Sequence, residues 1–185
     1  MELEEYKKKA IQRLNKSIAF DEKENMYYAC MGLIEETGEI VAELRKPLFK
    51  GNFHEKTLDI EEIKSELGDL MWYIALICKN TNIDMNQLHE HEGKEIENKR
   101  EKLIQTVIEI GKGSGRIVEE YQKVYGDEAD KSQLIEKIEN QYLNICELAR
   151  NLNLTIDEIL NENIRKTSSR YNEKGEANKS EEYEK

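Results

Sequence analysis

Apolar residues recur three and four positions apart along almost the whole chain, which is the spacing of one face of an α-helix. A single proline, Pro47, and ten glycines in 185 residues leave little of the turn chemistry that a many-stranded sheet protein needs. We therefore expect an all-α fold. The expected helices cover about residues 2–19, 23–46, 60–80, 86–110, 116–124, 131–151 and 156–167.

Local signals predict where several of these helices begin and end. Pro47 should end the second helix, because the residue before a proline is pushed out of the α region. Asp59 suits the N-cap of the third helix, since acidic side chains follow it in the first turn. The glycines at 111, 113 and 115 indicate a join or a loosened turn. Residues 172–185 are polar, and we expect this tail to be disordered.

Charge and hydropathy exclude several classes of partner. The formal net charge of −11 argues against nucleic acid and against an anionic membrane, both of which attract basic surfaces. The longest apolar run, from Leu70 to Cys78, is far shorter than the roughly 20 residues that a membrane-spanning helix needs. The first residues have no apolar core for a signal peptide, and the three separated cysteines fit a reduced compartment. These features predict a cytoplasmic protein.

The sequence contains an internal repeat. The pattern of residues 33–46, with Gly38 near its centre, reappears 77 positions later around Gly115. Residues 80–88 reappear 71 positions later as residues 151–159, and both stretches contain Asn-x-Asn. We interpret the chain as a tandem duplication, with residues 1–100 as the first copy and 101–171 as the second. The two copies would pair as a pseudo-dimer.

Two pairs of acidic residues interrupt the apolar faces of the second and third helices. Glu36 and Glu39 are about 60° apart around one helix, and Glu66 and Asp69 lie on the apolar stripe of the other. Acids that face each other in a core repel one another and are costly to desolvate. A positive charge must therefore compensate them.

Three kinds of compensation can be compared. A lysine or arginine cluster is one, but Lys64 and Arg45 point to the opposite helix faces. A di-iron site needs a Glu three residues before a His, and none of the three histidines (His54, His89 and His91) has one. Ligation by oxygen alone remains, and it suits Mg²⁺ or Mn²⁺ with water and phosphate completing the shell. In the rival interpretation the acids form surface salt bridges of a non-catalytic helical interaction module.

At these residues the chain resembles a known family. The segments GLIEETGEI and EEIKSELGDLMWYIA are similar to the MazG-like all-α NTP pyrophosphatases, a group that includes the dimeric dUTPases. Their ExxE and ExxD motifs are matched by the four acids, within a resemblance that covers about residues 25–87. It implies a MazG-like helical bundle that hydrolyses a nucleoside triphosphate to the monophosphate and pyrophosphate. dUTPase-like, dCTPase-like and phosphoribosyl-ATP pyrophosphohydrolase activities are close neighbours within that class.

The family's C-terminal motif, N-x-x-K-x-x-x-R-Y, is kept only in the second copy, as Asn163, Lys166, Arg170 and Tyr171. The second copy has in turn lost the acids, whose places are taken by Gly113, Arg116, Lys137 and Asn140. We therefore hypothesise one composite site in each chain. The first copy would supply the metal ligands, and Asn163, Lys166 and Arg170 would contact the substrate phosphates.

Four further residues are weaker candidates. Glu35 or Glu62 would orient the attacking water. Lys46 and Lys50 flank the connector between the second and third helices, where they either reach phosphates or are solvated. The expected partner is a small nucleotide whose base the sequence does not identify. The sequence also leaves open whether two chains associate as a homodimer of pseudo-dimers.

Overall fold

The structure is a computed structural model that describes residues 1–12, 14, 21–49, 57–89, 98–124, 130–172, 175, 176 and 178. The described residues form six α-helices and one short 3₁₀ helix, which confirms the predicted all-α class. The elements are α1 (Leu3–Gln12), α2 (Glu22–Phe49), α3 (Ile60–Asn80), η2 (Met85–Gln87), α4 (Lys99–Val124), α5 (Ser132–Asn151) and α6 (Ile156–Arg170).

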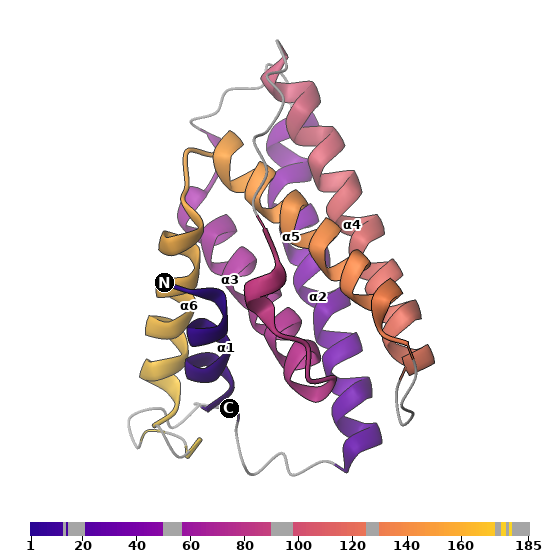
Figure 1. Ribbon diagram of the computed structural model, residues 1–185. Coiled ribbons are helices and arrows are strands. Elements are labelled where there is room, and N and C mark those ends of the chain that lie inside the picture. Colours follow the sequence, from indigo (N-terminus) through magenta and orange to yellow (C-terminus); the bar gives the residue numbers. More distant parts are fainter. Residues whose placement is uncertain are drawn as a thin grey trace.

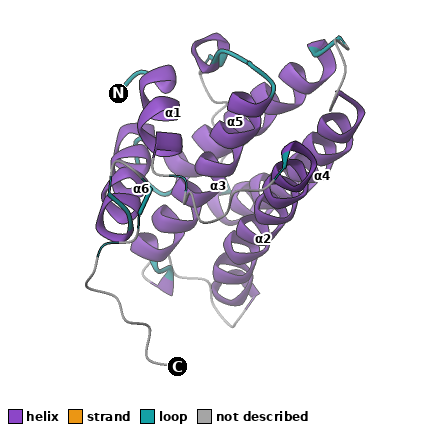
Figure 2. Cartoon of the chain, turned by 90° about the horizontal axis from the view of Figure 1, so that it is seen from below, coloured by secondary structure: helices purple, strands orange, loops and turns teal. Residues whose placement is uncertain are grey.

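Two pairs of helices build the body of the molecule. Helix α2 packs along α3, α4 packs along α5, and the two pairs meet where α2 contacts α4 (Figure 1). Helices α1 and α6 lie beside each other against α3, on the side away from α4 (Figures 1 and 2). Helix α3 is therefore covered both by α2 and by the first and last helices of the chain.

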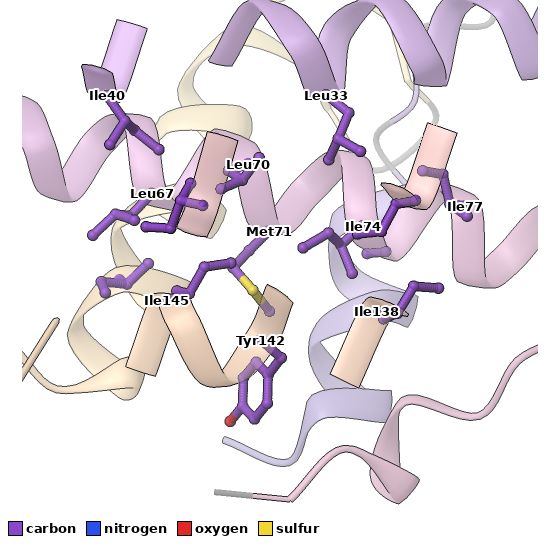
Figure 3. Packing of buried hydrophobic residues seen from close by; sticks show 14 of the residues in the cluster. Leu33, Ile40, Leu67, Leu70, Met71, Ile74, Ile77, Ile138, Tyr142 and Ile145 are labelled. Atoms are coloured by element: carbon purple, nitrogen blue, oxygen red, sulfur yellow. The ribbon is translucent and has the colours of Figure 1, made fainter. Parts of the chain in front are cut away.

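The core forms where α2, α3 and α5 turn their apolar stripes toward one another. Leu33 and Ile40 of α2, the stripe of α3 that includes Met71, and Ile138 and Tyr142 of α5 converge in this region (Figure 3). All five are at most 3% exposed. Burial of such side chains stabilises a helical protein more than intrinsic helix propensity does. No described helix is long and apolar enough to cross a bilayer.

Several predicted helix ends are confirmed. Helix α3 begins after Asp59, whose carboxylate accepts a hydrogen bond from the backbone N–H of Glu62 at 3.1 Å. Helix α6 begins after Thr155, and its capping box with Glu158 satisfies the first free N–H groups. The last helix extends to Arg170, three residues beyond its predicted end.

Other predicted ends are wrong. Helix α2 continues through Pro47 to Phe49, because the proline lies in the last turn and removes only one backbone donor there. The Leu48 carbonyl beyond it accepts a hydrogen bond from Arg100 Nε at 2.9 Å. Helix α4 runs without a break through Gly111, Gly113 and Gly115, since packing against α2 and α5 outweighs the low helix propensity of glycine.

Two more predicted segments differ from the structure. Helix α1 is described only to Gln12, and residues 13 and 15–19 of the expected first helix lie outside the described residues. The expected helix over 86–110 is replaced at its start by η2, and its main part begins only at Lys99. In the segment 172–185, the Asn178 side chain donates to the carbonyls of Ser168 and Ser169, and most of the other residues are not described.

The turns after α3 and after α5 have the same backbone geometry. Asn82 and Asn153, 71 positions apart, both have positive φ, at 55° and 58°. In each turn the N–H that follows bonds back to a helix carbonyl at 2.8 Å, from Ile83 to Cys78 and from Leu154 to Ala149. Non-glycine residues rarely adopt this backbone region, so a shared pair of such asparagines is a specific likeness between the two helix pairs.

Candidate functional site

Three of the four predicted acids gather between α2 and α3. Glu36 and Glu39 project from α2 and Glu66 from α3, and one carboxylate oxygen of each lies within 4.8 Å of the others. Glu66 is only 6% exposed, Glu36 is half-buried and Glu39 is exposed. This carboxylate cluster is therefore anchored in the core and open to solvent on the α2 side. Within the described ranges it is the one group of acidic, histidine or cysteine side chains spaced to share an ion.

Burial raises the pKa of two of these acids. The pKa of Glu36 is raised to about 7, mainly by burial and secondly by the negative charge of Asp69. The pKa of Glu66 is raised to about 8, mainly by burial and secondly by a hydrogen bond with Glu39. Without a cation, the cluster thus retains protons near neutral pH, because its charged form is poorly solvated. Hard divalent cations prefer such a set of carboxylate oxygens, so these residues fit Mg²⁺ or Mn²⁺.

Asp69 has different partners, which come from the far end of the chain. Its carboxylate accepts a hydrogen bond from Asn163 Nδ2 at 2.9 Å and forms an ion pair with the Lys166 ammonium group. The same ammonium group donates to Ser65 Oγ at 2.8 Å. A lysine thus compensates one of the four acids. The expectation that no lysine pairs with these acids, which rested on Lys64 and Arg45, is therefore wrong for Asp69.

A buried tyrosine orients Asn163 toward Asp69. Tyr6 of α1, with no exposed surface, donates from its hydroxyl to Asn163 Oδ1 at 2.8 Å, so the amide nitrogen faces Asp69. Gly68 permits this close approach, because a Cβ at that position would lie 2.9 Å from the Asn163 Cβ. The sequence places Tyr6 three residues after Leu3 in the expected first helix, and this spacing predicts a core position but no contact with Asn163.

The remaining predicted site residues that the structure describes do not join the cluster. Glu35 and Glu62 are exposed, and neither belongs to the group of carboxylates that could share an ion. Lys46 is exposed in the last turn of α2, and Arg170 is exposed at the end of α6. Lys50 lies outside the described residues.

An aromatic group lies one helical turn from the acids. The Tyr73 ring packs onto Gly32, where an added Cβ would lie 2.1 Å from two ring atoms. Its centroid is 5.0 Å from the ring of Trp72 and 5.8 Å from that of Tyr28. Trp72 donates from its indole nitrogen to the Ala10 carbonyl at 3.2 Å, which ties α1 to α3.

The corresponding positions of the second helix pair are not acidic. Lys137 forms an ion pair with Glu136, and Arg116 lies 4.0 Å from Glu109. Gly113 is covered by the side chain of Gln141. A separate cavity of about 650 Å³ is lined by the start of the chain, the region of η2, part of α5 and the start of α6 with the turn before it, and none of the four acids borders it.

Residues 26–102 match the family model of the MazG nucleotide pyrophosphohydrolase domain. This part of the chain is MazG-like. The MazG-like segment contains most of α2, all of α3 and η2, and the first residues of α4, and therefore all four acids. The Gene 37 protein of Mycobacterium phage L5 is 24% identical over 82 residues, which cover 44% of this chain and 72% of that protein. No solved structure matches the chain.

Proposed function

We propose that this protein is a Mg²⁺-dependent pyrophosphohydrolase that converts a nucleoside triphosphate into the monophosphate and pyrophosphate. The observation that supports it best is the carboxylate cluster of Glu36, Glu39 and Glu66, held between two helices of the MazG-like segment. A house-cleaning, dUTPase-like or dCTPase-like substrate range fits this class. The rival function, a helical interaction module with surface salt bridges, is disfavoured because Glu66 is 6% exposed and shares its surroundings with two other acids.

In this proposal Glu36, Glu39 and Glu66 hold Mg²⁺, and Asp69 is the fourth ligand when Lys166 turns toward a phosphate. The bound ion would neutralise phosphate charge and lower the pKa of a coordinated water. The half-buried Lys166 already lies beside the cluster and carries the charge that a phosphate needs. Glu35 and Glu62 remain the candidates for orienting the water, and Lys46, Lys50 and Arg170 for contacting the phosphates.

We further propose that the two helix pairs are copies within one chain, with the divisions at residues 1–100 and 101–171. The matching turns at Asn82 and Asn153 support a duplication. The contacts of Asn163 and Lys166 with Asp69 support a composite site, because they place second-copy residues on a first-copy acid. One chain would then contain one active site, with metal ligands and phosphate contacts contributed by different copies.

The experiment is a Mg²⁺ titration followed by thermal unfolding, paired with a pyrophosphate-release assay on a panel of NTPs and dNTPs. A ligand that binds only the folded state at 100 times its Kd adds about 2.7 kcal/mol of stability. We expect this shift in the wild type and in Glu61→Gln, whose carboxylate is exposed and pairs with Lys64. Glu66→Gln should lose both the shift and the activity. A shift that Glu66→Gln retains would rule out the cluster as the metal site.

A further inference from the structure

A buried chain of hydrogen bonds links the two helix pairs beside the carboxylate cluster. Thr37 of α2 lies between Glu36 and Glu39 in sequence, and its hydroxyl is 2.6 Å from the Ser114 hydroxyl of α4. Gln141 of α5 donates to Ser114 Oγ at 2.9 Å. The exposed fractions of Thr37, Ser114 and Gln141 are 7%, 1% and 0%. These three residues form the polar network discussed below.

The hydrogen bonds of the polar network can all form together in one arrangement. Thr37 has one hydroxyl hydrogen, which it donates to the Leu33 carbonyl at 2.7 Å. Ser114 must therefore donate to Thr37, while it accepts from Gln141. The second amide hydrogen of Gln141 goes to the Ile110 carbonyl at 3.0 Å. Removing one hydroxyl leaves a buried partner unsatisfied, which favours a shift of α2 against α4.

The polar network needs a residue without a side chain at the second-copy position that corresponds to Glu36. Gly113 occupies the position of Glu36 in the repeat, and a Cβ there would lie 1.9 Å from Gln141 Oε1. Any side chain at Gly113 would thus displace Gln141. The small Gly113 thus leaves room for Gln141, which donates to Ser114, the residue that contacts Thr37 of α2.

We propose that the polar network is a positioning device for the carboxylate cluster, and this inference rests on the proposed function. The Thr37 side chain projects about 100° from that of Glu36 around α2, so fixing Thr37 against α4 fixes the rotation of the helix. A carboxylate about 6 Å from the helix axis moves about 1 Å when the helix turns by about 10°. Metal–ligand distances tolerate only about 0.2 Å.

The test compares variants that keep or remove one hydroxyl. Thr37→Val removes the hydroxyl and preserves the shape, Thr37→Ser keeps the hydroxyl, and Ser114→Ala removes the partner. Ile117→Val is the control, because it reduces packing at a fully buried site of α4 without removing a polar group. For each variant, Mg²⁺ affinity is measured by calorimetry and stability by urea unfolding.

We expect Thr37→Val and Ser114→Ala to weaken Mg²⁺ binding about tenfold, as loss of a residue that orients metal ligands commonly does. Thr37→Ser should bind within about twofold of the wild type, and Ile117→Val should lose stability without losing affinity. The inference is overturned if Thr37→Val binds as tightly as Thr37→Ser, or if affinity simply follows stability in all variants. A wild type that binds no Mg²⁺ overturns the proposed function as well, so the two failures are distinguishable.

Discussion

Replacing Glu66 with glutamine should stabilise the metal-free protein at alkaline pH. Burial and the hydrogen bond with Glu39 raise the pKa of Glu66 from 4.5 to about 8 in the folded state. Between these two values the unfolded chain has released the proton and the folded chain still holds it. The free energy of unfolding of the wild type therefore falls as the pH rises from about 4.5 to about 8, and it levels off above that range. Glutamine does not titrate, so the variant lacks this loss.

The size of the effect follows from the pKa shift. One pKa unit corresponds to about 1.4 kcal/mol, which sets a ceiling of about 5 kcal/mol for Glu66. Solvent at the exposed Glu39 side of the cluster screens part of this, so we expect about 2 kcal/mol at pH 9. For a chain of this length, that difference is about 4–8 °C in Tm. A hydrogen bond with Glu66 also lowers the pKa of Glu36, so the difference between the two proteins belongs to the coupled pair of carboxyl groups.

The assay is thermal unfolding of the wild type and Glu66→Gln in EDTA at pH 5 and pH 9, repeated in Mg²⁺. At pH 5 the two proteins should have nearly equal Tm values, and at pH 9 in EDTA the variant should have the higher one. Mg²⁺ should reverse this order at pH 9, because only the wild type has the complete ligand set. Equal differences at both pH values in EDTA would show that Glu66 is not desolvated and would refute the reasoning.

Two further sets of variants test other contacts. Lys166→Ala should lower pyrophosphate release about 100-fold while Mg²⁺ binding persists, whereas Arg165→Ala, whose side chain is 72% exposed, should have little effect. Similar activities of these two variants would dispose of the composite site. Gly111→Ala and Gly115→Ala should each raise the free energy of unfolding by about 0.5–1 kcal/mol, because both positions are open. Gly113→Ala should be less stable than these two variants, because the collision with Gln141 opposes the same gain in helix propensity, and urea unfolding in which all three shift alike would contradict this.

The helices could largely be predicted from the sequence because their signals are local. Apolar spacing and the cap at Asp59 depend on neighbouring residues, and α3 has its predicted bounds. The predicted breaks at Pro47 and at the glycines of α4 are wrong because the structure there also depends on distant residues. The cost of the proline and the glycines is offset by partners elsewhere in the chain, such as Arg100 at the end of α2 and Gln141 over Gly113.

The proximity of three of the four acids could also be predicted, since ExxE and ExxD place carboxylates on known faces of two helices. The side chains that surround these acids could not be predicted, because their positions depend on packing between segments that are distant in the sequence. The Lys166–Asp69 ion pair joins residues 97 positions apart, and the Thr37–Ser114 hydrogen bond joins residues 77 apart. Periodicity marks such residues as buried or exposed and does not identify which side chain they meet.

The hydrogen bond from Tyr6 to Asn163 spans 157 positions of the chain. On the ribosome, Asp69 therefore emerges long before the lysine and the amide that satisfy it. The nascent chain carries its acids without their partners until α6 has been synthesised. The order of translation thus delays the completion of this centre until after the synthesis of the other described helices.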